Sequence, residues 1–178
     1  RIGALLCDYV FSTRTEKGTL PAKPAFVKTI VTSELQRLIA EDYGATCFET
    51  LTGFKYIGEM IHRFESGDEG YEYVFGGEES YGYLVGTAVR DKDGVSAAAM
   101  IAEAALYHAS EGRSLLDRLE QLWEKFGYFE EVLISRYFKG EAGSRCMKAF
   151  TDALRKNPPD RFASLPVVTV KDYLEGTT

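Results

Sequence analysis

Hydrophobic residues recur at two different spacings along the chain, and the alternation of these spacings predicts an α/β protein. Spacings of three and four residues are typical of helices, and short β-branched or alternating runs are typical of strands. Helices are predicted at residues 1–18, 33–44, 54–64, 95–109, 114–126 and 142–156. Strands are predicted at residues 26–31, 45–50, 71–75, 131–137 and 167–170. Strands that alternate with helices of this length favour a layered α/β sheet.

Three local signals sharpen this prediction. Ser33 with Gln36 three residues later is a capping-box pattern, which marks the start of a helix. The helix at 95–109 is apolar and small on most faces, so we expect it to be buried. Pro158-Pro159 cannot continue a helix and indicates a linker after the last long helix.

Composition places the chain among ordinary soluble globular proteins. It has 178 residues, 45% hydrophobic and 27% charged, enough for one domain or two small ones. The net charge of −6 argues against nucleic acid as a partner, because phosphate binding needs a basic surface. No apolar run approaches the roughly 20 residues that cross a bilayer, so no membrane contact is expected.

Cysteine and histidine usage narrows the chemistry further. Cys7, Cys47 and Cys146 are few, far apart and without a C-x-x-C pair, which favours buried thiols in a reducing, cytoplasmic compartment. Only two histidines are present, so a multi-histidine metal site is not expected. The chain starts at Arg1 without a signal-peptide layout, and we expect it to be a piece of a longer polypeptide.

The segment Phe75-Gly-Gly-Glu-Glu-Ser-Tyr-Gly82 carries the clearest candidate chemistry. Its paired glycines at a strand end would let the backbone turn sharply and approach a ligand. Glu78, Glu79 and Ser80 then follow as two acceptors and a donor for a polyhydroxylated ligand. A merely structural acidic turn remains the alternative.

This segment matches two other known motifs only in part. Gly77-x4-Gly82 matches the first part of a P-loop, but Tyr83-Leu84 stand where Lys-Ser/Thr is required, and the two glutamates would repel phosphate. Glu78-x-Ser80-x-Gly82 is one residue short of a nucleophile elbow, and neither histidine is well placed as its base.

Two further segments offer candidate residues. Arg90-Asp-Lys-Asp-Gly94 begins like an EF-hand loop but lacks the later glycine and glutamate, so calcium is rejected. Asp93 can cap the following helix, which leaves Lys92 free to point into a cleft. Lys92 could act as a general acid or base if its neighbours lower its proton affinity. Leu51-Thr-Gly-Phe-Lys55 is a strand-to-helix loop, for which an ordinary βα turn is the alternative.

Four segments together resemble the phosphoglucomutase/phosphomannomutase family, the α-D-phosphohexomutases. They are Lys28-Thr-Ile-Val-Thr-Ser33, Glu49-Thr-Leu-Thr-Gly-Phe-Lys-Tyr-Ile-Gly58, Gly77-Glu-Glu-Ser-Tyr-Gly82 and Arg90-Asp-Lys-Asp-Gly94. Their order and spacing match the third of that family's four domains. The resemblance implies a single α/β/α domain with a mixed sheet of about four strands at residues 1–157. It implies a linker and the truncated start of the fourth domain at residues 158–178.

The resemblance also implies roles for individual residues. Glu78 and Ser80 match the family residues that bind the sugar hydroxyls at C3 and C4. Thr52 and Gly53 match its sugar-facing loop, with Lys55 as their neighbour. Lys92, the implied catalytic residue, matches the lysine near the reacting end of the sugar.

The implied activity belongs to a longer enzyme. The resemblance implies the sugar-binding domain of an isomerase that interconverts hexose 1-phosphate and hexose 6-phosphate through a phosphoserine and a bisphosphate intermediate. The substrates would be glucose or mannose phosphates. The family's phosphoserine, magnesium and phosphate loops are missing from this sequence. Mg²⁺ is therefore expected on another domain of the same polypeptide, and this chain alone is expected to be inactive. A phosphopentose or phosphoglucosamine-type mutase and a non-catalytic sugar-binding module remain alternatives.

Overall fold

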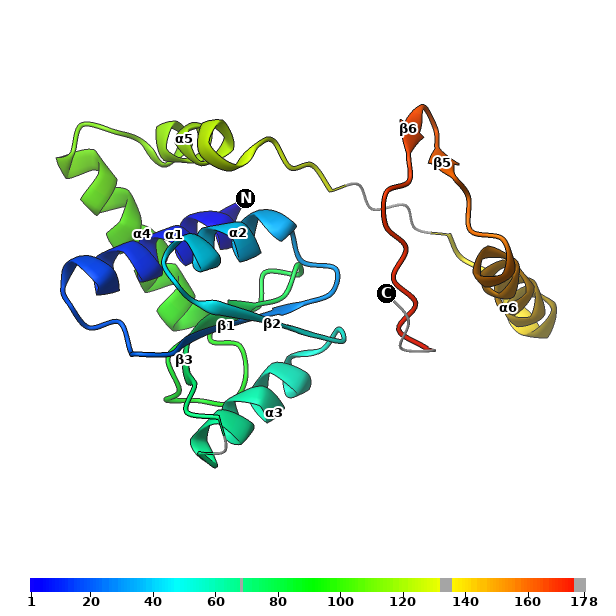
Figure 1. Cartoon of the computed structure of the whole chain (residues 1–178), viewed down its shortest axis with the longest axis horizontal. Helices are drawn as coiled ribbons and strands as arrows, with labels where there is room; N and C mark the ends of the chain where they lie inside the picture. Colours follow the sequence, from blue (N-terminus) through cyan, green and yellow to red (C-terminus); the bar gives the residue numbers. More distant parts are fainter. Residues whose placement is uncertain (68, 132–135, 175–178) are drawn as a thin grey trace. The chain divides into compact units, whose positions relative to one another are not determined.

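The structure of the chain is a computed structural model that describes residues 1–67, 69–131 and 136–174. It contains two compact units (Figure 1). The first unit comprises residues 1–131 and the second comprises residues 132–178. Each unit is described by itself below. The domain boundary expected at residue 157 stays a prediction.

The first unit is built around a mixed four-stranded sheet. Its elements are α1 (Ile2–Glu16), β1 (Pro24–Thr29), α2 (Glu34–Asp42), β2 (Thr46–Thr50), α3 (Phe54–Glu65), β3 (Glu72–Gly77), β4 (Tyr83–Val85), α4 (Gly94–Ser110) and α5 (Leu115–Phe126). The strand order is β2-β1-β3-β4, with β1 parallel to β2 and β3, and β4 antiparallel to β3. The predicted α/β class and mixed sheet are confirmed.

Helices cover both faces of this sheet. Figure 1 shows α3 on one side and α1 and α2 on the other. The buried side chains of β1 divide accordingly, since successive strand residues face opposite sides. Phe26 packs in the cluster formed with α1 and α2, whereas Ala25 and Val27 pack in the cluster formed with α3. The result is three α/β/α layers with an apolar core on each side of the sheet.

A bulge in β3 changes which face its aromatic residues occupy. Tyr73 pairs with Ala25, but Phe75 pairs with Phe26, so Val74 is skipped in the pairing with β1. Tyr73 consequently packs with α3, whereas Phe75 lies in the core on the α1 side. The strand predicted at residues 71–75 is confirmed, but the sequence did not predict that Tyr73 and Phe75 lie on opposite faces.

The fourth strand of the sheet is β4, which the hydrophobic pattern did not predict. Three residues are too few to show a period, and β4 forms only because the chain turns back along β3. Of the strand predicted at 131–137, residues 132–135 lie outside the described residues, and Glu131, Arg136 and Tyr137 are not in a strand.

Helix α4 is less buried than its composition predicted. Only Ala104 and His108 are buried, whereas Val95 is 82% exposed and Leu106 is 72% exposed. The expectation that this helix is covered on most faces is wrong for the part of the chain that the structure describes. Apolar composition shows that a helix favours a covering surface, but it does not say whether the same segment of chain supplies one.

The predicted capping box is also not formed. The Ser33 side chain accepts a hydrogen bond from the Leu35 amide, while the Gln36 side chain packs against Gly3 of α1. Gln36 is buried between α1 and α2, so it cannot reach back to the cap. A complete capping box occurs instead at α5, where Ser114 and Asp117 cap each other's amides.

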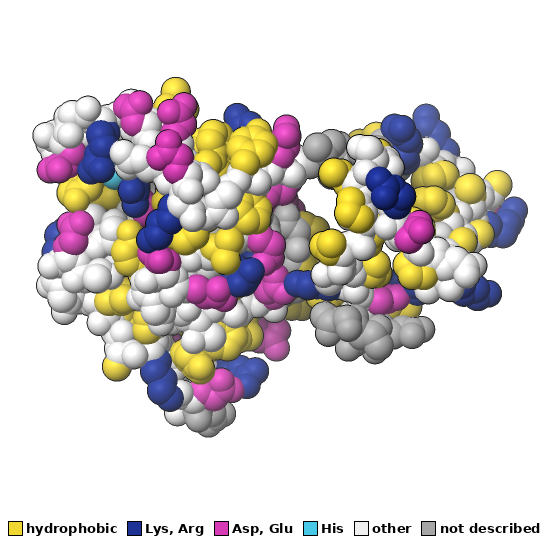
Figure 2. Space-filling view, turned by 45° about the horizontal axis from the view of Figure 1, so that its top comes forward, with side chains coloured by type: hydrophobic (Ala, Val, Ile, Leu, Met, Phe, Trp, Pro, Cys, Tyr) yellow, Lys and Arg dark blue, Asp and Glu magenta, His cyan; other side chains and the backbone are white. Residues whose placement is uncertain are grey.

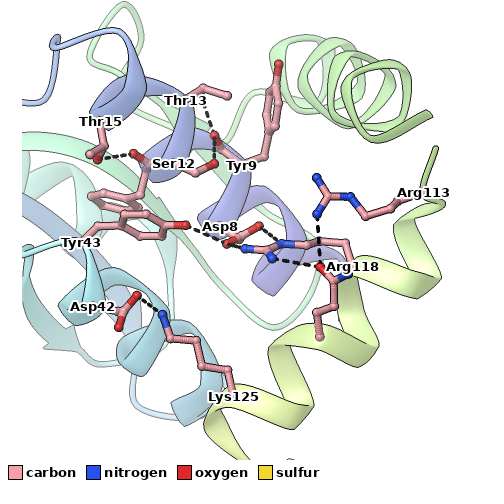
Figure 3. A network of polar contacts seen from close by, with 12 residues as sticks. Asp8, Tyr9, Ser12, Thr13, Thr15, Asp42, Tyr43, Arg113, Arg118 and Lys125 are labelled. Carbon is pink, nitrogen blue, oxygen red and sulfur yellow. Dashed lines mark hydrogen bonds and ion pairs between the residues drawn. The ribbon is translucent and has the colours of Figure 1, made fainter. Parts of the chain in front are cut away.

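Helix α5 is fastened to α1 by a buried ion pair, shown in Figure 3. The Asp8 carboxylate on α1 accepts two hydrogen bonds from Arg118, from Nε at 2.8 Å and from a terminal nitrogen at 2.7 Å. The Tyr43 hydroxyl donates a third at 3.2 Å. Burial, with a contribution from Asp8, raises the pKa of Tyr43 to about 12, so its hydroxyl stays protonated and can donate.

The second unit contains one long helix and a short hairpin. They are α6 (Gly140–Lys156), β5 (Arg161–Phe162) and β6 (Leu165–Pro166). The strand predicted at 167–170 is wrong, because these residues have no strand pairing. Cys146 on α6 is exposed, unlike the expected buried thiol. Within the described ranges, no helix is both long and apolar enough to cross a membrane.

Candidate functional site

The candidate residues gather at one edge of the sheet because three parallel strands end there. Thr29 at the end of β1 is in register with Thr50 at the end of β2, and Lys28 is in register with Gly77 at the end of β3. In α/β sheets, ligands bind beyond the carboxyl ends of parallel strands. The 52–53 loop follows β2 and the 78–82 loop follows β3, so both lie at this edge.

Glu78 and Lys92 form an ion pair at this edge. The Lys92 Nζ atom lies 2.9 Å from Glu78 Oε1. The Glu78 side chain is 7% exposed, whereas the Lys92 side chain is 55% exposed. The structure therefore brings together two residues that lie 14 positions apart, with the carboxylate held in the protein and the ammonium group open to solvent.

The turn that carries Lys92 is held from two sides. The Arg90 guanidinium donates to both carboxylate oxygens of Glu65 on α3, each at 2.7 Å. The Asp93 amide donates to the Tyr83 carbonyl of β4 at 2.9 Å. Asp93 caps α4 as predicted, because its side chain accepts from the Val95 amide.

The charge of Lys92 follows from its partner. The hydrogen bond to Glu78, with the attraction of its negative charge, raises the pKa of Lys92 above its ordinary value. Lys92 is therefore protonated at neutral pH, and the lowered proton affinity that general-base chemistry requires is not found. A lysine ammonium has three donors, so Lys92 can bind Glu78 and still donate to an anionic ligand.

The other predicted site residues are exposed or half-buried. Thr52 and Ser80 are exposed, and Gly53 precedes α3 with a φ of 119°, a backbone conformation that favours glycine. Lys55, the second residue of α3, places its ammonium group 4.8 Å from the centre of the Tyr56 ring. Thr52 and Ser80 thus offer hydroxyls at the edge, whereas Lys55 contacts its own helix.

The glycines of the 76–82 segment are required for a different reason from the one predicted. Gly76 and Gly77 lie within β3, and a Cβ on Gly76 would come within 2.4 Å of the Val27 carbonyl. A Cβ on Gly82 would lie 2.6 Å from Glu78 Oε1. These glycines therefore allow close packing inside the sheet and beside Glu78, rather than a sharp turn at the strand end.

The described residues do not form a metal site. Among residues 1–67, 69–131 and 136–174, no group of three or more His, Cys, Asp or Glu side chains could hold a metal ion. Magnesium on another domain stays a prediction. On the face of the first unit that Figure 2 draws at the left, acidic and basic side chains are interspersed.

Comparison with known proteins identifies the family. Residues 1–126 match the family described as phosphoglucomutase/phosphomannomutase, alpha/beta/alpha domain III. The chain belongs to this family. It is 34% identical over 172 residues to a phosphoglucomutase of Staphylococcus haemolyticus strain JCSC1435, covering 97% of this chain and 30% of the relative.

A further curated relative agrees with this assignment, and a solved structure agrees with the fold. A phosphoglucomutase of Staphylococcus aureus strain USA300 is 34% identical over 174 residues, covering 98% of this chain and 30% of the relative. A solved structure of a putative phosphomannomutase from Thermus thermophilus has a TM-score of 0.51 at 24% identity, covering 68% of this chain and 25% of that one, and supports the fold alone. The chain spans about 30% of the length of these curated relatives.

The family assignment draws attention to buried polar residues that pattern analysis missed. Lys28 and Thr29 lie in one of the quoted segments, yet no role was predicted for them. Both are completely buried at the end of β1. A lysine inside a β-branched strand run itself indicates a buried ion pair, because lysine is almost never fully buried unless it is paired.

Proposed function

We propose that this chain is the sugar-binding domain of a phosphoglucomutase/phosphomannomutase, an isomerase that interconverts hexose 1-phosphate and hexose 6-phosphate through a phosphoserine and a bisphosphate. The Glu78–Lys92 pair at the carboxyl edge of the sheet carries this proposal. It sets a buried carboxylate, which accepts sugar hydroxyls, beside an exposed cation, which attracts phosphate. Membership of the family supports the same interpretation.

The proposed roles follow from the chemistry of each group. Glu78 accepts hydrogen bonds from the hydroxyls at C3 and C4, and Ser80 and Thr52 contribute hydroxyls at the same edge of the sheet. Gly53 allows the backbone of the sugar-facing loop to come close. Lys92 stays charged and donates to the phosphosugar near its reacting end. Lys55 is left as a neighbour of this loop.

This arrangement suits a reaction in which the substrate must bind in two orientations. A site that recognises C3 and C4 can hold the ring either way round, and it need not recognise C2, where glucose and mannose differ. Phosphoryl transfer depends mainly on positioning and charge neutralisation. In this proposal the domain supplies positioning, and the phosphoserine and magnesium belong to other domains of the same polypeptide. Residues 1–157 form the sugar-binding domain, and residues 158–178 form the linker to the next domain.

Binding to the chain tests the proposal directly. Titration of the ¹⁵N-labelled 178-residue chain with glucose 1-phosphate is expected to shift the amide signals of residues 52–53, 78–82 and 92. Mannose 1-phosphate should shift the same signals, because C3 and C4 are common to both sugars. Ribose 1-phosphate serves as the control, and stronger shifts with ribose would favour a phosphopentomutase. Shifts confined to other parts of the chain would contradict the proposed site.

We also expect the isolated chain to have no mutase activity. In the proposal, the transferred phosphoryl group and the magnesium are held by other domains, so the chain can bind but not convert. A coupled assay of glucose 1-phosphate conversion checks this with the purified 178-residue chain. Conversion above the level of a Glu78→Ala sample purified in parallel would overturn the proposed division of roles.

A further inference from the structure

The loop that carries Glu78 is tied to β1 by the residue next to it. Glu79 Oε2 accepts a hydrogen bond from the Thr29 hydroxyl at 2.9 Å. Thr29 is completely buried at the carboxyl end of β1, and Glu79 lies 50 positions further along the chain. Glu78 and Glu79 therefore bind in different places: Glu78 pairs with Lys92, and Glu79 binds the neighbouring strand.

The direction of the protons in this contact can be worked out. The Thr29 and Thr32 hydroxyl oxygens lie 2.8 Å apart. A carboxylate can only accept, so the single Thr29 proton points to Glu79, and Thr29 in turn accepts from Thr32. A relay of two buried hydroxyls thus ends on Glu79. A hydrogen bond to a charged acceptor is stronger than one between neutral groups.

The turn that contains Thr32 is also held by Lys28, the residue before Thr29 on β1. Lys28 Nζ donates to the Thr32 carbonyl at 3.1 Å, to Glu34 Oε1 at 2.8 Å and to Glu49 Oε1 at 2.7 Å. Burial by itself lowers the pKa of Lys28, but the hydrogen bonds to Glu34 and Glu49 outweigh it and raise the pKa overall. All three donors of this lysine are used, so the turn is anchored to β2 and α2.

The 78–82 loop needs such an anchor because its backbone is under strain. Tyr81 adopts a φ of 64°, a left-handed conformation that non-glycine residues rarely take, and its side chain is exposed. A hydrogen bond from the Glu78 amide to the Gly82 carbonyl at 2.8 Å closes the loop, next to the pairing of Gly77 with Tyr83. Two contacts outside the loop, of Glu79 with Thr29 and of Glu78 with Lys92, oppose this strain, and only the first fixes the loop to the sheet.

We propose that Thr29 is a positioning residue whose bond to Glu79 holds the 78–82 loop with Glu78 beside Lys92. The consequence for sugar affinity rests on the proposed function, whereas the order of the loop does not. Thr29 has no contact with substrate in this proposal. It acts through Glu79 on the backbone that orients Glu78.

The test compares matched variants in the full-length polypeptide that carries this domain. Thr29→Val keeps the shape of the side chain and removes the hydroxyl, and is expected to raise KM for glucose 1-phosphate about 10-fold with kcat changed by less than about 2-fold. Thr29→Ser restores the hydroxyl and should restore KM. Thr13→Val, which removes another buried threonine hydroxyl on α1, is the control and should leave KM unchanged.

A second measurement separates this inference from the proposed function. Hydrogen–deuterium exchange of the 76–83 peptide in the same proteins should quicken about 10-fold in Thr29→Val, but not in Thr29→Ser or Thr13→Val. Exchange in α3 reports general loosening and should stay unchanged. An unchanged 76–83 peptide overturns the inference. If exchange of this peptide quickens in Thr29→Val but the wild-type protein has no mutase activity, the positioning role is supported and the proposed function is overturned. A quickened peptide with unchanged KM overturns the link to sugar affinity.

Discussion

Glu78→Ala in the full-length polypeptide is expected to lower kcat/KM roughly 10- to 200-fold for glucose 1-phosphate and mannose 1-phosphate alike. The carboxylate is proposed to accept the C3 and C4 hydroxyls, and a charge-assisted contact of this kind contributes about 1.5–3 kcal/mol. Both sugars carry the same hydroxyls at these carbons, so both should lose the same amount. Steady-state kinetics with the two substrates measures the effect.

The matched variant is Glu79→Ala on the neighbouring residue. Glu79 faces Thr29 rather than Lys92, so its loss should be smaller than that of Glu78 and should appear mainly in KM. Glu78→Gln keeps the shape but not the charge and should fall between wild type and Glu78→Ala. A damaging Glu79→Ala beside a neutral Glu78→Ala would contradict the assignment, as would a Glu78→Ala effect confined to one sugar.

Asp8→Ala is expected to lower the free energy of unfolding of the first unit by about 3 kcal/mol, because it leaves a largely buried guanidinium without its carboxylate. Asp8 is 1% exposed, and the Arg118 side chain that it pairs with is 23% exposed. Urea unfolding at pH 7, followed by the fluorescence of Trp123, reports the effect. Trp123 is the one tryptophan of the chain and lies on α5, the helix that this pair fastens.

Asp42→Ala provides the control for this prediction. Asp42 pairs with Lys125, also on α5, but both side chains are substantially exposed. Exposed ion pairs contribute about 0–1 kcal/mol, so Asp42→Ala should change the free energy of unfolding by less than about 1 kcal/mol. Similar losses in the two variants would show that the buried Asp8–Arg118 pair has no special role in holding α5.

The long helices and the three parallel strands could be predicted from the sequence because each has a strong local period. α2, α3 and α5 each present an apolar face at helical spacing, α1 is apolar over most of its length, and each of β1 and β2 contains a short β-branched or aromatic run. β4 could not be predicted, since its three residues are held only by pairing with β3. The outer face of α4 was mispredicted because composition does not reveal which surface covers a helix.

Some features of the candidate site could likewise be predicted from the sequence, and others could not. The sequence by itself determined which residues are chemically suited to a sugar phosphate, because carboxylates, hydroxyls and a lysine stand at fixed positions in the family segments. The placement of the 52–53 and 78–82 loops at one sheet edge also follows from parallel strands ending together, whereas Lys92 follows the antiparallel strand β4.

Only the tertiary structure decided how these residues act on one another. It paired Glu78 with Lys92, which keeps the lysine charged, and it bound Glu79 to Thr29 on another strand. It also showed that Gly82 leaves space for the Glu78 carboxylate. The two hydrogen bonds join residues 14 and 50 positions apart, and their geometry depends on strand register and loop conformation, which no local pattern of side chains encodes.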